Sequence, residues 1–193
     1  PLTHLRAVHQ RCRTAGVGLH LDGARLWNAH IATGVSLRTY GQLFDTVSVC
    51  FSKGLGAPVG SMLVASAPRI AGARVLRKRL GAGWRQAGLL AAAAAYALDR
   101  HVDRLADDHA AAQAFAAAVA DRAPAAVDPA RVVTNIVVLD SGPRPAAEIA
   151  AQARSAGVAV SALGARMIRA VTHLEVSLPR ARAAGAVLGE LLS

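Results

Sequence analysis

The sequence has few aromatic residues and few cysteines. Aromatic side chains make up 4% of the 193 residues. This leaves little material for the stacking platforms that bind single-stranded nucleic acid. The two cysteines, Cys12 and Cys50, stand in no CxxC pair and predict no disulfide framework. Such cysteine usage favours a reducing, cytoplasmic compartment, and Cys50, inside an apolar run, is expected in the core.

The sequence also lacks a signal peptide and any apolar run long enough to cross a bilayer. The most apolar stretch, "AGLLAAAAAYAL" (87–98), falls short of the about 20 residues that a spanning helix needs. The chain starts at Pro1 rather than at methionine, and a helical pattern begins at once. We therefore expect a fragment or a processed chain.

Lysine is nearly absent, although the formal net charge is +10. Arginine supplies almost all of the positive charge, and the only lysines are Lys53 and Lys78. The charge could attract anions, or it could reflect a GC-rich genome that encodes basic residues as arginine. The second interpretation is favoured because the arginines are scattered and form no long block. No helix-turn-helix or zinc signature supports nucleic-acid binding.

Strand-like and helical segments alternate, which predicts an α/β fold with a largely parallel sheet. We expect a first lobe over residues 1–98 and a connecting helix with a smaller lobe over 99–193. An alanine-rich segment from 85 to 122 predicts one long helix, broken near Asp99. The expected strands are 17–22, 46–52, 61–66, 131–140, 158–164 and 167–173, and the expected helices include 2–14, 24–32, 68–80, 145–157 and 178–193. The helix over 68–80 is expected to be basic and amphipathic, with an inward apolar stripe of Ile70, Ala73, Leu76 and Leu80.

Two predicted strands of the first lobe end near charged residues, Asp22 and Lys53. Because ligands collect at the carboxyl ends of parallel strands, both residues are candidates for a site. A lysine in a partly desolvated pocket loses its proton more easily and then attacks carbonyl groups. Pyridoxal phosphate fits this pair, since its aldehyde condenses with a lysine and its ring nitrogen pairs with a carboxylate.

Four motifs occur in order along most of the chain: "HLDGARLWNA", "SKGLGAPVGS", "RKRLGAGWRQAGLLAAAAAYAL" and "IRAVTH". Together they resemble the low-specificity threonine aldolases, pyridoxal-phosphate enzymes of the beta-eliminating lyase group with the aspartate aminotransferase fold (fold type I). The resemblance implies a partial large domain followed by a small C-terminal domain. It also implies a homo-oligomeric lyase that cleaves β-hydroxy-α-amino acids to glycine and an aldehyde.

The resemblance assigns roles to residues at the cofactor. Lys53 would form the Schiff base with pyridoxal phosphate, and Asp22 would pair with the pyridine nitrogen. Ser52 and Arg25 would also contact the cofactor. In this family the phosphate site and the residue stacked on the ring come from a segment before the aspartate strand. This chain contains no such segment, so the resemblance implies the C-terminal part of the enzyme.

The substrate is also assigned residues by the resemblance. Arg169, in "IRAVTH", matches an arginine that holds the substrate α-carboxylate, a task suited to the two parallel hydrogen bonds of a guanidinium. Arg25 could share this contact. Lys78 and Arg85 match basic positions near the active site, at the subunit interface. No metal ligand is implied.

Each assignment has a simpler alternative. Asp22 could cap the following helix. Arg25 and Arg169 could be surface arginines, and Lys78 could lie on the solvated face of its helix. His20 and His173 are expected to pack in the core rather than to transfer protons. At the level of function, the alternatives are another pyridoxal-phosphate reaction, such as β-elimination or transamination, and a non-catalytic oligomerisation module.

Overall fold

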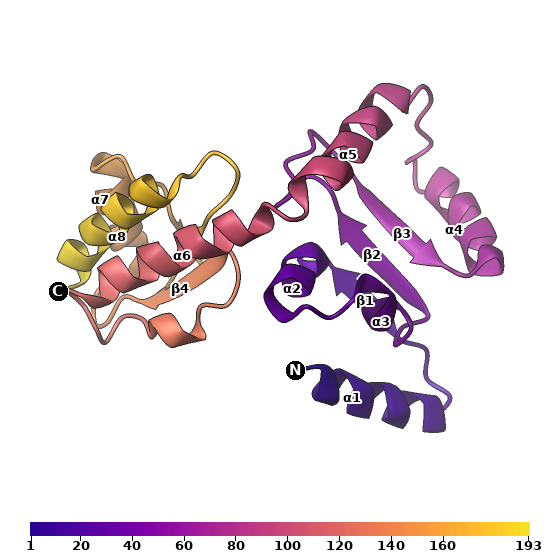
Figure 1. The fold of residues 1–193 in the computed structure, drawn as a ribbon, viewed down its shortest axis with the longest axis horizontal. Helices are drawn as coiled ribbons and strands as arrows, with labels where there is room; N and C mark the ends of the chain where they lie inside the picture. Colours follow the sequence, from indigo (N-terminus) through magenta and orange to yellow (C-terminus); the bar gives the residue numbers. More distant parts are fainter. The chain divides into compact units, whose positions relative to one another are not determined.

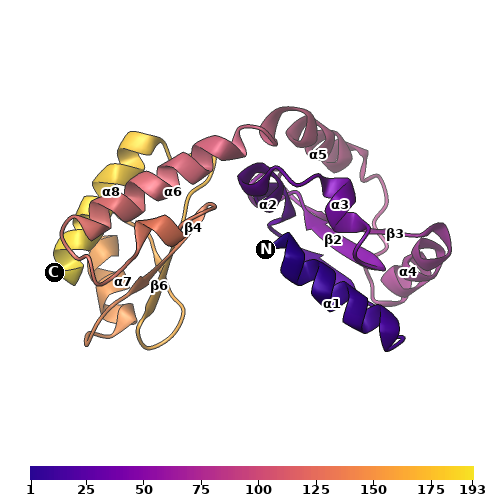
Figure 2. The same cartoon turned by 60° about the horizontal axis from the view of Figure 1, so that its bottom comes forward.

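The computed structural model describes all 193 residues, which divide into two compact units, Pro1–Val102 and Asp103–Ser193 (Figures 1 and 2). The division falls after residue 102, whereas the sequence suggests a boundary between 98 and 99. No helix is both long enough and apolar enough to cross a membrane.

Unit 1 contains a three-stranded sheet of β1 (His20–Gly23), β2 (Thr46–Cys50) and β3 (Ser61–Ala65), in that order. Strands β1 and β2 are parallel, as expected, but β3 runs antiparallel to β2. The expectation of a largely parallel sheet is therefore wrong for β3. The segment between β2 and β3 is too short to hold a crossover helix, so the chain turns back on itself.

Five helices accompany this sheet. Four of them fall where the periodicity predicts, whereas α3 is short and was not predicted; Ser36 caps it by accepting a hydrogen bond from Thr39 N at 3.1 Å. Helix α1 ends just before Gly16, whose φ of 67° suits glycine. The helices are α1 (Leu2–Thr14), α2 (Leu26–Thr33), α3 (Leu37–Gly41), α4 (Ala67–Arg79) and α5 (Gly88–His101).

Asp45 ties the start of β1 to helix α4. Its carboxylate accepts a hydrogen bond from Leu19 N at 2.9 Å and pairs with Arg69 at 2.9 Å. The hydrogen bond from Leu19 lowers the pKa of Asp45; burial opposes this effect, and the nearby charges of Arg69 and Arg13 add smaller contributions that also lower the pKa. The lowered pKa favours the ionised carboxylate, which connects the sheet to the helix.

The apolar stripe expected to face inward from α4 is not fully covered. No residue of this helix is buried, and Leu76 and Leu80 are 57% and 84% exposed. The same holds for β3, where Met62 and Leu63, which point to opposite faces, are 52% and 38% exposed. The prediction of an inward-facing stripe is therefore wrong for the second half of α4, whereas Ile70 and Ala73 in the first half are half-buried.

We expect the exposed apolar residues of α4 and β3 to make the purified chain self-associate. Two copies that pack these residues against each other remove apolar surface from water, which is favourable. Replacing Met62 and Val64, which share one face of β3, with lysine should lower the association constant by about tenfold or more, since unpaired charges resist burial. Sedimentation velocity over a range of concentrations measures this. Val133→Lys in unit 2, at a position 67% exposed, is the matched control. A wild-type chain that stays monomeric at high concentration would contradict the expectation.

Unit 2 is an antiparallel sheet covered on one face by helices. The strand order is β4 (Ile136–Asp140), β6 (Met167–Val171) and β5 (Ser161–Ala162). Alternate strand residues such as Val137, Leu139 and Ile168 are buried in a core with α6 (Leu105–Ala120), α7 (Ala146–Ser155) and α8 (Leu178–Leu192). Helices α6 and α8 lie side by side in both views (Figures 1 and 2). Gly185 permits this contact, because a Cβ there would lie 2.4 Å from the Phe115 carbonyl oxygen.

The alanine-rich segment forms two helices, and the break expected near Asp99 lies a few residues beyond it. Helix α5 ends at His101 and α6 begins at Leu105, so the break lies at residues 102–104. No glycine or proline marks this position in the sequence. On one side of the break His101 Nδ1 bonds to the Leu55 carbonyl oxygen at 2.6 Å, and on the other side Arg104 pairs with Asp108 at 2.5 Å. Side-chain contacts within each unit thus flank the break.

Candidate active site

Lys53 lies in a tight loop that connects β2 to β3. Backbone hydrogen bonds close the loop, from Phe51 N to Gly60 O at 3.0 Å and from Gly56 N to Lys53 O at 2.9 Å. Gly56 and Gly60 have φ values of 69° and 116°, a region that side chains disfavour. The glycines of "KGLGAPVG" therefore set the path of the loop, and with it the position of the lysine.

Two aromatic residues from neighbouring helices support this loop. Trp27 of α2 donates its Nε1–H to the Cys50 carbonyl oxygen at 3.0 Å, and its ring stacks on Phe51 with centroids 6.3 Å apart. His101, at the end of α5, bonds to the carbonyl oxygen of Leu55, which is fully buried. Hydrogen bonds from the ring nitrogens of Trp27 and His101 therefore hold the backbone on both sides of Lys53.

Asp22, Ser52 and Lys53 line one pocket of about 370 Å³. This arrangement follows from the parallel pairing of β1 with β2, which brings their carboxyl ends to the same edge of the sheet. The pocket thus contains one carboxylate, one primary amine and several small polar side chains. The other lining residues are Ala24, Ser48, Val49, Cys50, Gly60 and Ser61.

Asp22 is not the cap of helix α2. That helix begins at Leu26 with Arg25 as its N-cap residue and no side-chain cap, so the capping alternative is wrong. The Asp22 carboxylate instead accepts a hydrogen bond from Ala24 N at 3.1 Å, which turns the chain at the end of β1. The next residue, Gly23, could not carry a side chain, since its Cβ would lie 2.4 Å from Ser48 O. Asp22 is thus fixed beside β2.

Lys53 is exposed, and its side chain makes no hydrogen bond or ion pair with the rest of the chain. Within unit 1 the lysine is therefore not partly desolvated as expected, because the residues of this unit leave the pocket open. An amine without an internal partner is available to react with a carbonyl carbon.

The other basic candidates of unit 1 do not line this pocket. Arg25 is half-buried at the start of α2. Lys78 is exposed in the last turn of α4, as the solvated-face alternative expects, and its side chain lies over Gly83, within 2.8 Å of where a Cβ would be. Arg85 is exposed in the segment between α4 and α5. Within unit 1, the structure therefore brings together Asp22 and Lys53 but not these residues.

Arg169 lies on β6 in unit 2, opposite Val138 of β4 and Ser161 of β5. Its neighbours Ile168 and Ala170 point into the core, so Arg169 projects from the face of the sheet that no helix covers. The residue is half-buried, and its Nε is buried without a hydrogen-bond partner. A guanidinium group with an unused donor is well suited to bind an anion.

The model of the beta-eliminating lyase family matches residues 1–141, which is most of the chain. The chain belongs to the beta-eliminating lyase family. Among curated relatives, the low-specificity L-threonine aldolase of Escherichia coli K12 is 38% identical over 177 residues, which are 92% of this chain and 52% of the relative. The low-specificity L-threonine aldolase 1 of Arabidopsis thaliana is 41% identical over 173 residues, 88% of this chain and 48% of the relative.

The chain thus spans about half the length of these curated relatives. A solved structure of Leishmania major threonine aldolase covers all of it with a TM-score of 0.78, at 19% identity and over 57% of the solved chain. This likeness shows the fold. The predicted fold class, fold type I of the pyridoxal-phosphate enzymes with a partial large domain, is confirmed, as is the resemblance to the threonine aldolases.

Sequence reasoning missed several residues around the pocket that Asp22 and Lys53 line. Ser48 and Cys50 alternate along β2 on the side of the strand that lines the pocket, whereas Val47 points to the other side and is buried. The signal was present in "TVSVC", where small polar residues alternate with valine. The supporting roles of Trp27 and His101 left no such signal, because each depends on a contact distant in sequence.

Two histidines are placed differently from the expectation. His20 and His173 are both exposed, so the core placement is wrong. His20 Nδ1 bonds to Thr46 Oγ1 at 2.8 Å, and His173 Nδ1 accepts a hydrogen bond from Glu175 N at 3.4 Å. In unit 2, burial lowers the pKa of His109, although the neighbouring charge of Asp108 acts in the opposite direction.

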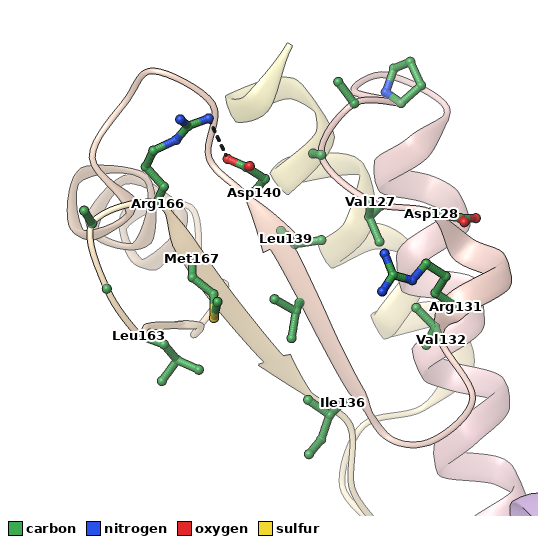
Figure 3. A pocket seen from close by; sticks show the side chains of 16 residues that line it. Val127, Asp128, Arg131, Val132, Ile136, Leu139, Asp140, Leu163, Arg166 and Met167 are labelled. Carbon is green, nitrogen blue, oxygen red and sulfur yellow. Dashed lines mark hydrogen bonds and ion pairs between the residues drawn. The ribbon is translucent and has the colours of Figure 1, made fainter. Parts of the chain in front are cut away.

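A second hollow, of about 860 Å³, lies within unit 2 (Figure 3). Figure 3 shows Arg131 on one side of it and an ion pair between Arg166 and Asp140, 3.2 Å apart, on the other. None of the residues predicted for the cofactor or the substrate lines it. Two carboxylates, Asp128 and Asp140, and two guanidinium groups, Arg131 and Arg166, line this hollow. Their charges balance, so the hollow has no net preference for an anion or a cation.

Proposed function

We propose that this chain is the lysine-bearing part of a pyridoxal-phosphate-dependent lyase that cleaves β-hydroxy-α-amino acids such as threonine to glycine and an aldehyde. The observation that carries the proposal is the pocket shared by Asp22, Ser52 and Lys53. Membership of the beta-eliminating lyase family and the similarity to low-specificity threonine aldolases support it.

The pocket residues fit the two reactive ends of pyridoxal phosphate. The free amine of Lys53 would hold the aldehyde covalently, and the Asp22 carboxylate would accept a hydrogen bond from the protonated ring nitrogen. The Ser52 hydroxyl would provide a further hydrogen bond to the cofactor. When bound, the cofactor supplies an electron sink for the charge left on the substrate α-carbon. No second cation lines this pocket for the phosphate; Arg25 lies nearby in sequence at the start of α2.

The remaining predicted residues would act on the amino acid. Arg169 would bind the α-carboxylate through two parallel hydrogen bonds, with Arg25, Lys78 and Arg85 contributing further positive charge. A carboxylate held in this way fixes the orientation of the bond between the α- and β-carbons. Cleavage then moves the proton of the β-hydroxyl group to a base, forms the aldehyde, and leaves glycine after the α-carbon is protonated. We further propose that the complete protein is a homo-oligomer.

Product analysis tests this function directly. The purified protein, supplied with pyridoxal phosphate and L-threonine or L-allo-threonine, should release glycine and acetaldehyde in equal amounts, measurable by NMR. Ammonia with a keto acid would instead indicate β-elimination, and transfer of the amino group to an added keto acid would indicate transamination. Absence of any product together with absence of cofactor binding would overturn the proposal in favour of a non-catalytic module.

A further inference from the structure

A group of buried polar residues in unit 2 is not explained by the chemistry above. Asp108, in the first turn of α6, has a side chain that is 1% exposed and pairs with Arg104 at 2.5 Å. Asp108 Oδ2 and Arg104 Nη1 are buried and have no further hydrogen-bond partner in the chain. A buried ion pair with unsatisfied atoms adds little or nothing to stability compared with apolar residues. Its presence therefore calls for a role other than stabilisation.

The backbone carbonyl group of Asp108 connects this ion pair to the end of β6. The buried hydroxyl of Thr172, the residue that follows β6, donates a hydrogen bond to the Asp108 carbonyl oxygen at 2.6 Å. The same threonine donates its backbone N–H to Asn135 O at 3.0 Å, and Asn135 Nδ2 donates to Thr172 O at 2.8 Å. Thr172 is thus held through its hydroxyl, its N–H and its carbonyl group.

These contacts fix the register between β6 and β4. The strands pair Ile136 with Val171, and Asn135 with Thr172 is the next pair along the ladder. A slip of one residue in an antiparallel pair turns every side chain of the strand to the opposite face. In β6 such a slip would turn Arg169 into the core and expose Ile168, which is now fully buried. A locked end pair therefore decides which face Arg169 occupies.

We propose that Thr172, Asn135 and the Arg104–Asp108 pair are positioning residues that hold β6 so that Arg169 is presented to the substrate carboxylate. This inference rests on the proposed function, in which Arg169 binds that carboxylate. None of these four residues has to touch the substrate. Thr172 lies on the helix-covered side of the sheet and Arg169 on the uncovered side, because residues three apart on a strand point in opposite directions.

The test compares Thr172→Val, which removes the hydroxyl group at constant shape, with Thr172→Ser, which keeps it. In the cofactor-loaded protein, Thr172→Val should weaken binding of threonine about tenfold, the scale of one lost buried hydrogen bond. Binding of threonine amide, which lacks the carboxylate, should change less than about twofold, as should cofactor affinity. Thr172→Ser should restore the preference for the carboxylate. If Thr172→Val does not fold, Thr172→Ala removes the same hydroxyl group and carries the same expectation.

Hydrogen exchange in the cofactor-free protein gives a second measurement. The amides of Ala170, Val171 and Thr172 should exchange faster in Thr172→Val than in Thr172→Ser or the wild type. An equal loss of affinity for threonine and its amide would overturn the proposal, and so would unchanged affinity for both. If the wild type binds no amino acid at all, the proposed function fails separately, and the exchange comparison alone decides whether Thr172 holds β6.

Discussion

Replacement of Lys53 by alanine should abolish both turnover and the visible absorbance of the bound cofactor, while the fold survives. The side chain is exposed and has no partner in the chain, so its removal leaves no buried group unsatisfied. Lys53→Arg should be equally inactive. A guanidinium group stays protonated and cannot attack an aldehyde, although it preserves the charge and much of the length. Absorbance spectra, steady-state rates and thermal unfolding of both variants measure these effects.

The near-absence of lysine makes the assignment of Lys53 unusually direct. Reduction of the cofactor-loaded protein with borohydride makes the bond to the amine permanent, and mass spectrometry of the peptides then locates it. Among lysine side chains the label can reside only on Lys53 or Lys78, since the sequence contains no other lysine. Label on Lys78, or normal turnover by Lys53→Arg, would contradict the assignment.

The common position of Asp22 and Lys53 could be derived from the sequence. Asp22 ends one predicted strand and Lys53 follows the next, and a helical segment lies between the two strands, which predicts a parallel pair with carboxyl ends at one edge. The structure has this pairing, from His20 opposite Thr46 to Gly23 opposite Val49. The position of a site at this edge depends on the backbone topology, which local sequence patterns predict well.

The exposure of Lys53 and of helix α4 could not be derived in the same way. A periodic apolar stripe predicts a covered face, but it does not say which element covers that face. Leu76 and Leu80 belong to such a stripe and are exposed, since no element of this chain lies over them. The break between α5 and α6, expected near Asp99, lies at residues 102–104 for a related reason. The partners of His101 and Arg104 include Leu55, which lies far away in sequence.

Replacement of Arg169 by leucine should weaken binding of the amino-acid substrate by about 2–5 kcal/mol, the scale for removing one partner of a desolvated charge pair. Cofactor affinity should hardly change, since this arginine is expected to hold the substrate rather than the ring. Arg169→Lys should give an intermediate loss, because an ammonium group keeps the charge but cannot form two parallel hydrogen bonds. Steady-state kinetics beside a cofactor titration separates the two effects.

Arg166 supplies the matched control for Arg169. It belongs to the same unit, lies just before β6 and pairs with Asp140 at 3.2 Å on the surface. Exposed ion pairs of this kind contribute about 0–1 kcal/mol, so Arg166→Leu should leave the Michaelis constant for threonine close to that of the wild type. Since both substitutions remove one positive charge, a similar effect of the two would mean that only the overall charge matters. A specific loss with Arg169→Leu would require a fixed guanidinium group at this position, and an unchanged Michaelis constant would show that Arg169 does not hold the carboxylate.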